Sequence, residues 1–391
     1  MKKILHLIVF LLFAVSAAAQ DIPEPYRAVA LKVEELTGFP AREGNSITWY
    51  RDGDAFLADY FRDLSAAKES VEAEIYQFRH GGAGSAIRDA LIAKALQGVK
   101  VSLVVENISN PREPYTFYNA LRKAGADLLF YTNPDGRLWE ILKDVNNRTH
   151  RKLIVLDHTI GYTGGMNWVE VIRHREDIHF RVEGPVVADM HRLLVETRER
   201  LGGASCSGGS QLSACGSITA QLVPGGRADY PVMGTLYAEA FRSARKSLYI
   251  RTPYFCPSKE ILSVLKDAAG RGVDVRLYVP DGSDWPLADG IGKSYYKELM
   301  EAGVHIFECR GFFNHAKIFI VDGYLGCAGT VNLDQRSLNI NEEDCLFLYG
   351  SQALEYLQAD FERIQQLATE LTVPPRRWPH RYLFRVFSPW M

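Results

Sequence analysis

The chain has 391 residues, enough for two domains of ordinary size with a hydrophobic core each. Its composition is globular, with 47% hydrophobic and 24% charged residues. The formal net charge of -2 gives no overall field that would attract a polyanion, which argues against a protein built mainly to bind nucleic acid.

The first 20 residues have the pattern of a secretory signal peptide. Lys2 and Lys3 precede an apolar stretch, and Ala17-Ala18-Ala19 offers a cleavage site. The apolar stretch is shorter than the roughly 20 residues that a membrane-spanning helix needs. We therefore favour a cleaved signal over a retained anchor, and expect an exported protein that is periplasmic or peripheral at a membrane.

Two units of alternating helices and strands follow a lead-in at 21–45. The first unit is expected at 46–201 and the second at 217–371, with a Gly/Ser-rich linker at 202–216 and a tail at 372–391. In the first unit the patterns predict helices at 55–65, 87–96 and 117–123, and strands at 70–78, 99–105 and 127–131. The second unit repeats this order, with helices at 236–244, 261–269 and 295–300, and strands at 247–252, 273–279 and 304–308.

This alternation predicts an α/β fold with largely parallel strands and helices on both faces of the sheet. Because the order of elements repeats, we expect two similar αβα sandwich halves related by a pseudo-two-fold axis. Sites in such an arrangement often form where the halves meet, so we place the active site at their interface.

The strongest signal is an HxKxxxxD motif that occurs twice. The first copy contains His150, Lys152 and Asp157, and is followed by Asn167. The second copy contains His315, Lys317 and Asp322, and is followed by Asn332. Each residue of the second copy follows its counterpart at the same distance along the chain. A single copy would be weak evidence for a site, since it fixes only three residues, but two matched copies are strong evidence.

These residue types suit phosphoryl transfer without a metal. On a strand, each histidine shares a face with the lysine two residues later. The lysines and asparagines can bind non-bridging phosphate oxygens. One histidine can attack phosphorus, and the other can protonate the leaving alcohol and later deprotonate the acceptor.

Four carboxylates accompany the motifs. Asp157 and Asp322 lie at an odd offset from the histidines, on the other face of an unbroken strand, so we assign them a structural or orienting role although they belong to the motif. Asp177 and Glu343 follow the two motifs and are candidates to orient the imidazoles. Their alternative role is that of solvated strand ends.

The six cysteines fit an exported protein. Cys206 and Cys215 lie in a Gly/Ser loop, where they form a disulfide or remain a pair of free thiols in a linker; we favour the disulfide. The other four cysteines have apolar, strand-like neighbours typical of a core. No cysteine or Cys/His cluster has the spacing of zinc ligands, so the sequence predicts no metal and no cofactor.

With this duplicated motif the chain resembles the phospholipase D superfamily, and within it the bacterial cardiolipin synthases. The stretches that carry the resemblance are HRKLIVLD, YTGGMN, TPYFCPSKEIL, RGVDVRLYVP and HAKIFIVDGYLGCAGTVNLDQRS, and the likeness covers roughly 46–391. It implies a covalent phosphatidyl-histidine and transfer to an alcohol, with a phospholipid such as phosphatidylglycerol as donor. By analogy, His150 is the nucleophile and His315 the acid/base.

The two ends of the chain bear on membrane contact. Cardiolipin synthases typically begin with two transmembrane helices, whereas this chain has one short signal-like segment. Its tail interleaves aromatic residues with arginines, a composition suited to a lipid interface. We expect peripheral membrane contact, with packing of the tail against the domain as the alternative. The residues concerned are Trp378, Tyr382, Phe384, Phe387, Trp390, Arg376, Arg377, Arg381 and Arg385.

Two other functions remain open. With water as the acceptor, the same chemistry would make an exported phospholipase D or a nuclease. Near His315 in the sequence the one cation outside the motif is Arg310, which favours a lipid over a nucleic acid. A binding protein without activity is the other alternative, and the two intact His-Lys-Asn sets argue against it.

Overall fold

The computed structural model describes residues 17–111, 113–132, 146–173, 175–204, 212–226, 228–373 and 385. Most of the predicted signal peptide, Cys206 and most of the C-terminal tail lie outside these residues, so the predicted disulfide and the tail's membrane contact stay predictions. Cys215 is exposed. Within the described ranges, no helix has both the length and the apolar character needed to cross a bilayer.

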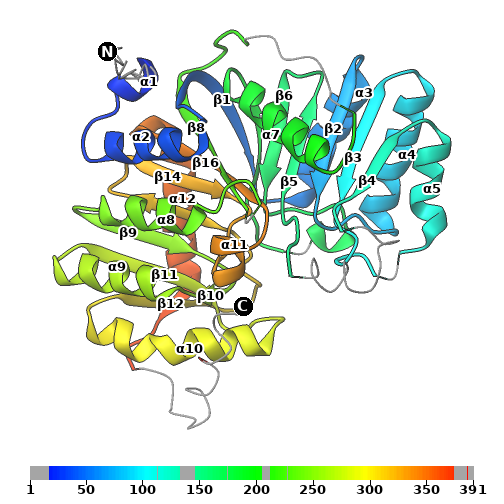
Figure 1. Ribbon diagram of the computed structural model, residues 1–391. Helices are drawn as coiled ribbons and strands as arrows, with labels where there is room; N and C mark the ends of the chain where they lie inside the picture. Colours follow the sequence, from blue (N-terminus) through cyan, green and yellow to red (C-terminus); the bar gives the residue numbers. More distant parts are fainter. Residues whose placement is uncertain are drawn as a thin grey trace, which may run out of the picture.

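Each half contributes its own strands to the main sheet (Figure 1). The first half supplies β1 (Arg42–Tyr50), β2 (Ser70–Ile75), β3 (Lys100–Val105), β4 (Asp127–Phe130), β5 (Lys152–Leu156), β6 (Ile160–Gly164) and β7 (His179–Glu183). The second half supplies β8 (Ile218–Gly225), β9 (Ser247–Arg251), β11 (Asp274–Pro280), β12 (His305–Cys309), β13 (Ile318–Val321), β14 (Leu325–Gly329), β16 (Glu343–Tyr349) and β17 (Ala368–Glu370). A separate two-stranded sheet pairs β10 (Phe255–Cys256) with β15 (Leu333–Asp334).

One continuous sheet joins the two halves. In the described part of the chain its order is β17-β12-β11-β9-β13-β14-β16-β8-β1-β7-β6-β5-β2-β3-β4. Apart from the edge strand β17, corresponding strands of the two halves follow one another in the same order outward from the central β8–β1 pair. That central pair is antiparallel, as a two-fold relation between the halves requires. The predicted pair of similar halves is confirmed.

The prediction of largely parallel strands is wrong. In the first half β2, β3 and β4 are parallel, and in the second β9, β11 and β12 are parallel. The strands that carry the motifs pair antiparallel with both of their neighbours. The reason is that a tight turn follows each motif strand, and a short turn can join only antiparallel strands. The sequence pattern of helices between strands covered only the three parallel strands of each half, β2, β3 and β4 in the first and β9, β11 and β12 in the second.

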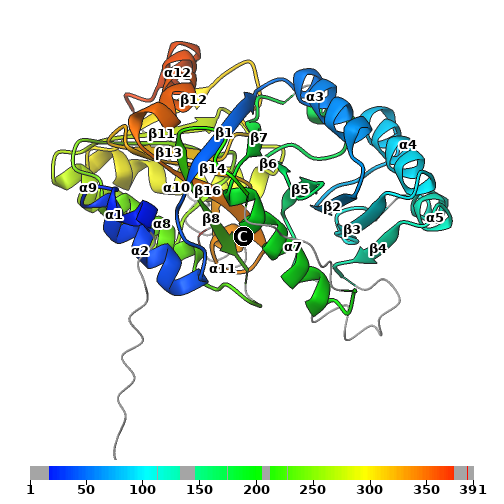
Figure 2. The ribbon, with the colours of Figure 1, turned by 90° about the horizontal axis from the view of Figure 1, so that it is seen from above.

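Helices cover both faces of each half (Figure 2). In the first half, α3 (Gly53–Ala66), α4 (Gly82–Leu96) and α5 (Tyr115–Lys123) pack on one face and α7 (Val186–Arg200) on the other. In the second half, α8 (Met233–Arg242), α9 (Lys259–Gly270) and α10 (Pro286–Glu301) pack on one face and α12 (Ser351–Leu367) on the other. Alternate residues of β5 supply the two cores, Leu153 and Val155 on the α7 side and Ile154 and Leu156 on the other. The core under α7 and α12 draws on both halves.

The predicted lead-in packs as part of the folded unit. It contains α2 (Tyr26–Thr37) and the start of β1, which pairs with both β7 and β8. The short α1 (Ala17–Gln20), at the end of the predicted signal peptide, precedes it. Helix α2 lies against the second half rather than the first. Its Tyr26 stacks on Tyr324 with ring centres 4.9 Å apart and donates a hydrogen bond of 2.8 Å to Asp322.

The motif aspartates hold the chain at the ends of β5 and β13. Each strand ends one residue before its aspartate, which adopts a left-handed backbone conformation, with φ of 46° at Asp157 and 53° at Asp322. The assumption of an unbroken strand is therefore wrong. The Asp157 carboxylate accepts hydrogen bonds of 2.8, 2.8 and 2.9 Å from the backbone N–H groups of Lys68, Glu69 and Ser70. Asp322 makes the same bonds with the backbone of Arg245, Lys246 and Ser247.

Replacing Asp157 by alanine tests this structural role. Three backbone donors lose a charged acceptor, so we expect the free energy of unfolding in urea to fall by about 2 kcal/mol at pH 7. The exposed Asp89→Ala variant should change it by less than about 0.5 kcal/mol. Burial raises the pKa of Asp157, but its backbone hydrogen bonds outweigh burial and hold that pKa below the usual value. The difference between wild type and Asp157→Ala should therefore shrink as the pH falls below about 4. Equal stability of the two proteins at pH 7 would contradict the assignment.

Candidate active site

The residues just before each motif strand cross to the other half of the molecule. The backbone N–H of His150 donates to the carbonyl of Glu342 at 2.7 Å, and that of His315 donates to the carbonyl of Glu176 at 2.8 Å. Thr149 and Glu342 form a parallel bridge, and Glu176 and Asn314 form another. Each motif histidine is thus held in place by the half to which it does not belong.

The side chains repeat this exchange. His150 Nδ1 lies 2.9 and 3.0 Å from the two carboxylate oxygens of Glu343 in the second half. His315 Nδ1 lies 2.5 Å from Asp177 Oδ2 in the first half. All four side chains are buried. The structure therefore places a carboxylate beside each imidazole, as the sequence led us to expect, and in each pair the carboxylate comes from the opposite half.

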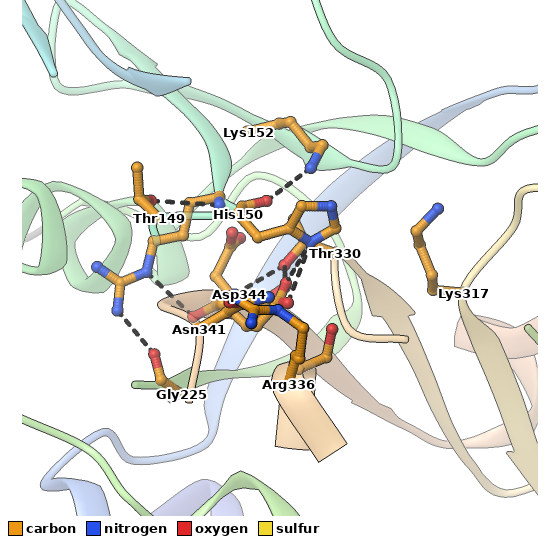
Figure 3. A network of polar contacts seen from close by, with 12 residues as sticks. Thr149, His150, Lys152, Gly225, Lys317, Thr330, Arg336, Asn341 and Asp344 are labelled. Atoms are coloured by element: carbon orange, nitrogen blue, oxygen red, sulfur yellow. Dashed lines mark hydrogen bonds and ion pairs between the residues drawn. The ribbon is translucent and has the colours of Figure 1, made fainter. Parts of the chain in front are cut away.

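Both motif lysines are buried next to the histidines. Lys152 Nζ donates to the carbonyl of His150 at 2.6 Å and lies 4.9 Å from the ring centre of Tyr76. Lys317 Nζ is 2.8 Å from Nδ1 and 3.2 Å from Nε2 of His315. Figure 3 shows the side chains of Lys152 and Lys317 on different sides of the His150 ring. The two cations thus come from both halves and lie beside one site.

A cavity of about 500 Å³ opens over these residues. Asn167 lines it, and its Oδ1 accepts a hydrogen bond of 3.2 Å from the backbone N–H of Gln77, which leaves its amide N–H₂ free to donate elsewhere. Asn332 lines it as well, and its buried Oδ1 has no hydrogen-bond partner. The cavity lining includes Tyr76, Arg79, Arg148, His150, Asn167, Arg175, Tyr254, Trp285, His315, Asn332, Asp334 and Arg336.

Burial dominates the electrostatics of the four motif side chains. It lowers the pKa of His150 to about 4 and that of His315 to about 3, against the attraction of their carboxylates. It also lowers the pKa of Lys152 to about 7 and that of Lys317 to about 8. Both imidazoles are therefore neutral near pH 7, and both lysines titrate close to it.

The paired carboxylates stay ionised. Burial raises the pKa of Asp177, but Lys317 and His315 outweigh it and hold that pKa well below its usual range. Burial likewise raises the pKa of Glu343, and His150 outweighs it, with a net lowering. A carboxylate that accepts the Nδ1 proton leaves Nε2 as the ring nitrogen for substrate.

The two halves support their carboxylates differently. At Gly165 a Cβ would lie 2.0 Å from Asp177 Oδ1, so glycine makes room for that carboxylate. The corresponding residue of the second copy is Thr330, whose hydroxyl donates to Glu343 Oε2 at 2.5 Å. The difference between Gly165 and Thr330 therefore goes with a difference between the acids. The half with glycine faces Asp177, and the half with threonine gives the longer Glu343 an additional hydrogen bond.

Arg151 fixes the crossing between the halves. Its fully buried guanidinium lies 3.2 Å from Glu74 of the first half and 2.9 Å from Glu342 of the second. It also donates to the carbonyls of Gly225 at 3.0 Å and Glu343 at 3.0 Å. Burial disfavours its charge, but Glu74 and Glu342 outweigh burial and raise the pKa of Arg151.

Sequence reasoning missed most of the cations around the cavity. It considered Arg310, which does not line the cavity, whereas Arg79, Arg148, Arg175 and Arg336 do. Arg175 NH1 lies 3.4 Å from His315 Nε2, and its NH2 lies 3.0 Å from Asp284. These arginines come from three separate loops and from the short helix α11 (Gln335–Asn339), so no spacing in the sequence connects them. They suit phosphate in a lipid or in a nucleic acid, and the weak preference drawn from Arg310 does not hold.

Replacing Arg151 by methionine tests the crossing. Two buried glutamates lose their counterion, so we expect the free energy of unfolding to fall by about 3–5 kcal/mol. The matched control is Arg242→Met, because Arg242 also lies between two glutamates, Glu239 and Glu260, but on the surface. That change should cost at most about 1 kcal/mol. Denaturant titration of both variants measures the difference, and equal losses would contradict the role given to Arg151.

Comparison with known proteins gives a family. The sequence profile described as "Cardiolipin synthase, PLD-like domain" matches residues 60–191 and 237–365, one match in each half. Cardiolipin synthase 1 of Bacillus cereus is 30% identical over 361 residues, which cover 87% of this chain and 70% of that protein. The cardiolipin synthase of Geobacillus sp. (strain WCH70) is 33% identical over 323 residues, 79% of this chain and 64% of that protein.

Solved structures show the same fold at lower sequence identity. A phosphatidylserine synthase of Haemophilus influenzae Rd KW20 aligns with a TM-score of 0.64 at 15% identity, over 92% of this chain and 96% of that one. A polyphosphate kinase of Porphyromonas gingivalis aligns with a TM-score of 0.58 at 16% identity, over 84% of this chain and 48% of that one. The likeness at such identities concerns the fold alone.

Proposed function

Because the chain belongs to the phospholipase D-like family whose profile matches both halves, we propose that it is a metal-independent phosphatidyltransferase of cardiolipin-synthase type. One observation carries the proposal: the histidines of the two His–carboxylate pairs and the two asparagines, from both halves, line one cavity, and the two motif lysines lie beside those histidines. The donor set suits a phosphate anion better than a metal ion. Glu343 and Asp177 are engaged with imidazoles, and the remaining charged motif groups in the cluster are lysines.

In the first step the phosphate of a phospholipid lies between Lys152 and Lys317. Nε2 of His150 attacks phosphorus, a P–N bond forms, and the bond from phosphorus to the headgroup oxygen breaks. The bound phosphate anion favours a charged imidazole, so His315, neutral in the empty site, takes up a proton when the substrate binds and donates it to that oxygen. With phosphatidylglycerol as donor the leaving group then departs as neutral glycerol. The assignment of His150 as nucleophile rests on the family resemblance.

In the second step an alcohol replaces the leaving group. His315, now neutral, takes the proton of the acceptor hydroxyl, the oxygen attacks phosphorus, and the P–N bond breaks. Both histidines return to their starting state. With a second phosphatidylglycerol as acceptor, the products are one cardiolipin and one glycerol from two substrate molecules.

The cavity and the relatives support a lipid substrate. Trp285 lies at the cavity and is 46% exposed, so it offers an apolar ring beside the groups that would bind phosphate. The curated relatives named above are cardiolipin synthases. We also propose that the protein is exported and acts peripherally at a membrane surface, from which such a lipid would reach the cavity.

Incubation of the purified chain with phosphatidylglycerol vesicles tests the function. We expect cardiolipin and glycerol in equal amounts, and a loss of at least about a thousandfold in rate for His150→Ala and for His315→Ala. The control is His305→Ala, because His305 also pairs with a carboxylate, Glu370, but on the surface and away from the cavity. It should keep full activity.

Other products would identify other functions. Phosphatidic acid without cardiolipin would show a hydrolase. Cleavage of single-stranded DNA without added metal, with no activity on lipid, would show a nuclease. No turnover of either substrate by folded protein would contradict the assignment as an enzyme of this type.

The pH dependence of kcat/KM should be bell-shaped. The attacking imidazole must be neutral, so activity rises as the pH increases through about 4, the pKa to which burial lowers His150. The lysines must be charged to bind phosphate, so activity falls as the pH rises through about 7 to 8. Lys152→Arg keeps its charge at all these pH values, and should move the alkaline limb toward the titration of Lys317. An unchanged alkaline limb in that variant would exclude Lys152 as its cause.

A further inference from the structure

A second cluster of chemically versatile side chains lies at the other end of β5 from His150. It consists of Glu72 on β2, His158 in the turn after β5, and His191 on α7. Glu72 alternates with Val71 and Ala73, which face the core under α3, α4 and α5, so it points to the opposite face, where α7 packs. The proposed catalytic chemistry uses none of the three.

The three side chains have the separation that a metal ion requires. One ligand atom from each lies within 4.8 Å of those of the other two. His191 Nε2 is 3.2 Å from Glu72 Oε2, and His158 Nδ1 is 3.7 Å from Glu72 Oε1. Bonds of about 2.0–2.1 Å at tetrahedral angles hold zinc ligands about 3.3 Å apart. The observed distances lie on either side of that value.

These polar atoms lack hydrogen-bond partners. Glu72 is 1% exposed, and neither of its carboxylate oxygens makes a hydrogen bond. The same holds for Nδ1 of His158 and Nε2 of the buried His191. Within the described residues, the ion pairs of Glu72 are those with the two histidines. A buried carboxylate without hydrogen bonds is costly, and a cation held between it and two imidazoles would remove that cost.

The duplication shows that the fold does not require this cluster. The strand registers align Glu72 with Tyr249 of the second half, and His158 with Gly323. On the covering helices His191 aligns with Leu357, as judged from the glycines that precede them, Gly184 and Gly350. Glycine suits the left-handed backbone at Gly323, where φ is 68°, whereas His158 adopts a φ of 57° that costs a histidine about 1 kcal/mol or more. The first half thus holds a histidine in an unfavourable conformation at a position where the fold accepts glycine.

We propose that Glu72, His158 and His191 form a binding site for one divalent cation of zinc type. Two imidazole nitrogens and one carboxylate oxygen are ligands that such an ion prefers. The side chain of His158 is 18% exposed, which leaves a solvent path for a fourth ligand, a water molecule. Nε2 of His158 lies 3.3 Å from Ser70 Oγ, a contact that orients the ring. Bound there, the ion joins α7 to β2 and to the turn that Asp157 stabilises.

Local spacing in the sequence does not reveal this site, which contains no cysteine. The three residues lie on a strand, a turn and a helix that are far apart in the chain. The inference does not depend on the proposed function, because it concerns a different part of the molecule and a structural role.

Zinc titration of the full chain tests the proposal. Protein treated with a chelator and dialysed is titrated with zinc chloride against a chromophoric chelator, and its melting temperature is measured with and without zinc. We expect wild type to bind one more zinc ion per chain than Glu72→Gln or His191→Ala. If a variant still binds zinc at this site, its affinity for zinc should be at least about tenfold lower than that of wild type. Zinc should raise the melting temperature of wild type and not that of the two variants.

His305→Ala controls for adventitious binding by surface histidines, and should bind as wild type does. Zinc taken up by the catalytic histidines contributes equally to all four proteins, so the comparison isolates the proposed site. Glu72→Gln keeps the size of the side chain and serves if His191→Ala fails to fold, which far-ultraviolet circular dichroism detects. Equal zinc binding by wild type and Glu72→Gln, or no binding by either, would overturn the proposal and leave the cluster a His–Glu ion pair.

Discussion

The exchange of carboxylates between the halves is the interaction on which the candidate site depends. His150 belongs to the first half and pairs with Glu343 of the second, while His315 belongs to the second and pairs with Asp177 of the first. A half on its own would hold a buried imidazole without its acid, and a buried carboxylate without its counterion. The continuous sheet through β8 and β1 and the core shared by α7 and α12 fix the two halves rigidly enough for these short contacts. Duplication therefore produced one site from two motifs, rather than two sites.

Burial gives this site its chemical character and its cost. In water the imidazoles and lysines would have their ordinary pKa values, but between the halves burial lowers the pKa values of both residue types. Such a site suits an anionic phosphate. The negative charge of the ligand stabilises the charged form of the buried lysines, which burial alone disfavours. The halves have diverged around this shared chemistry. Arg151 has Ala316 as its counterpart, whereas in the second half a buried arginine, Arg251 on β9, lies beside Asn314 and Asp360.

Much of the fold could be predicted from one sequence because the signal occurs twice. The repeated motif located the strands β5 and β13, and apolar periodicity located α4, α9 and their neighbours. What failed has physical reasons. Tight turns follow the motif strands, so these strands are antiparallel to their neighbours and not parallel as expected. No nearby residue in the sequence indicates that the Asp157 carboxylate binds the backbone at the start of β2. The pairing of carboxylate with histidine depends on the docking of the halves. The arginines of the cavity come from separate loops and from α11, so both features follow only from the tertiary structure.

The central claim is that one histidine carries the phosphatidyl group while the other moves protons. The direct measurement is intact mass, followed by peptide mapping, of His315→Ala after reaction with a phosphatidyl ester of p-nitrophenol. That leaving group departs without an acid, whereas transfer to the acceptor still needs the base that the variant lacks. We predict a burst of one p-nitrophenol per chain and one phosphatidyl group on His150. An adduct on any residue other than His150 would contradict the account. So would the absence of an adduct in the variant when wild type turns over the same ester.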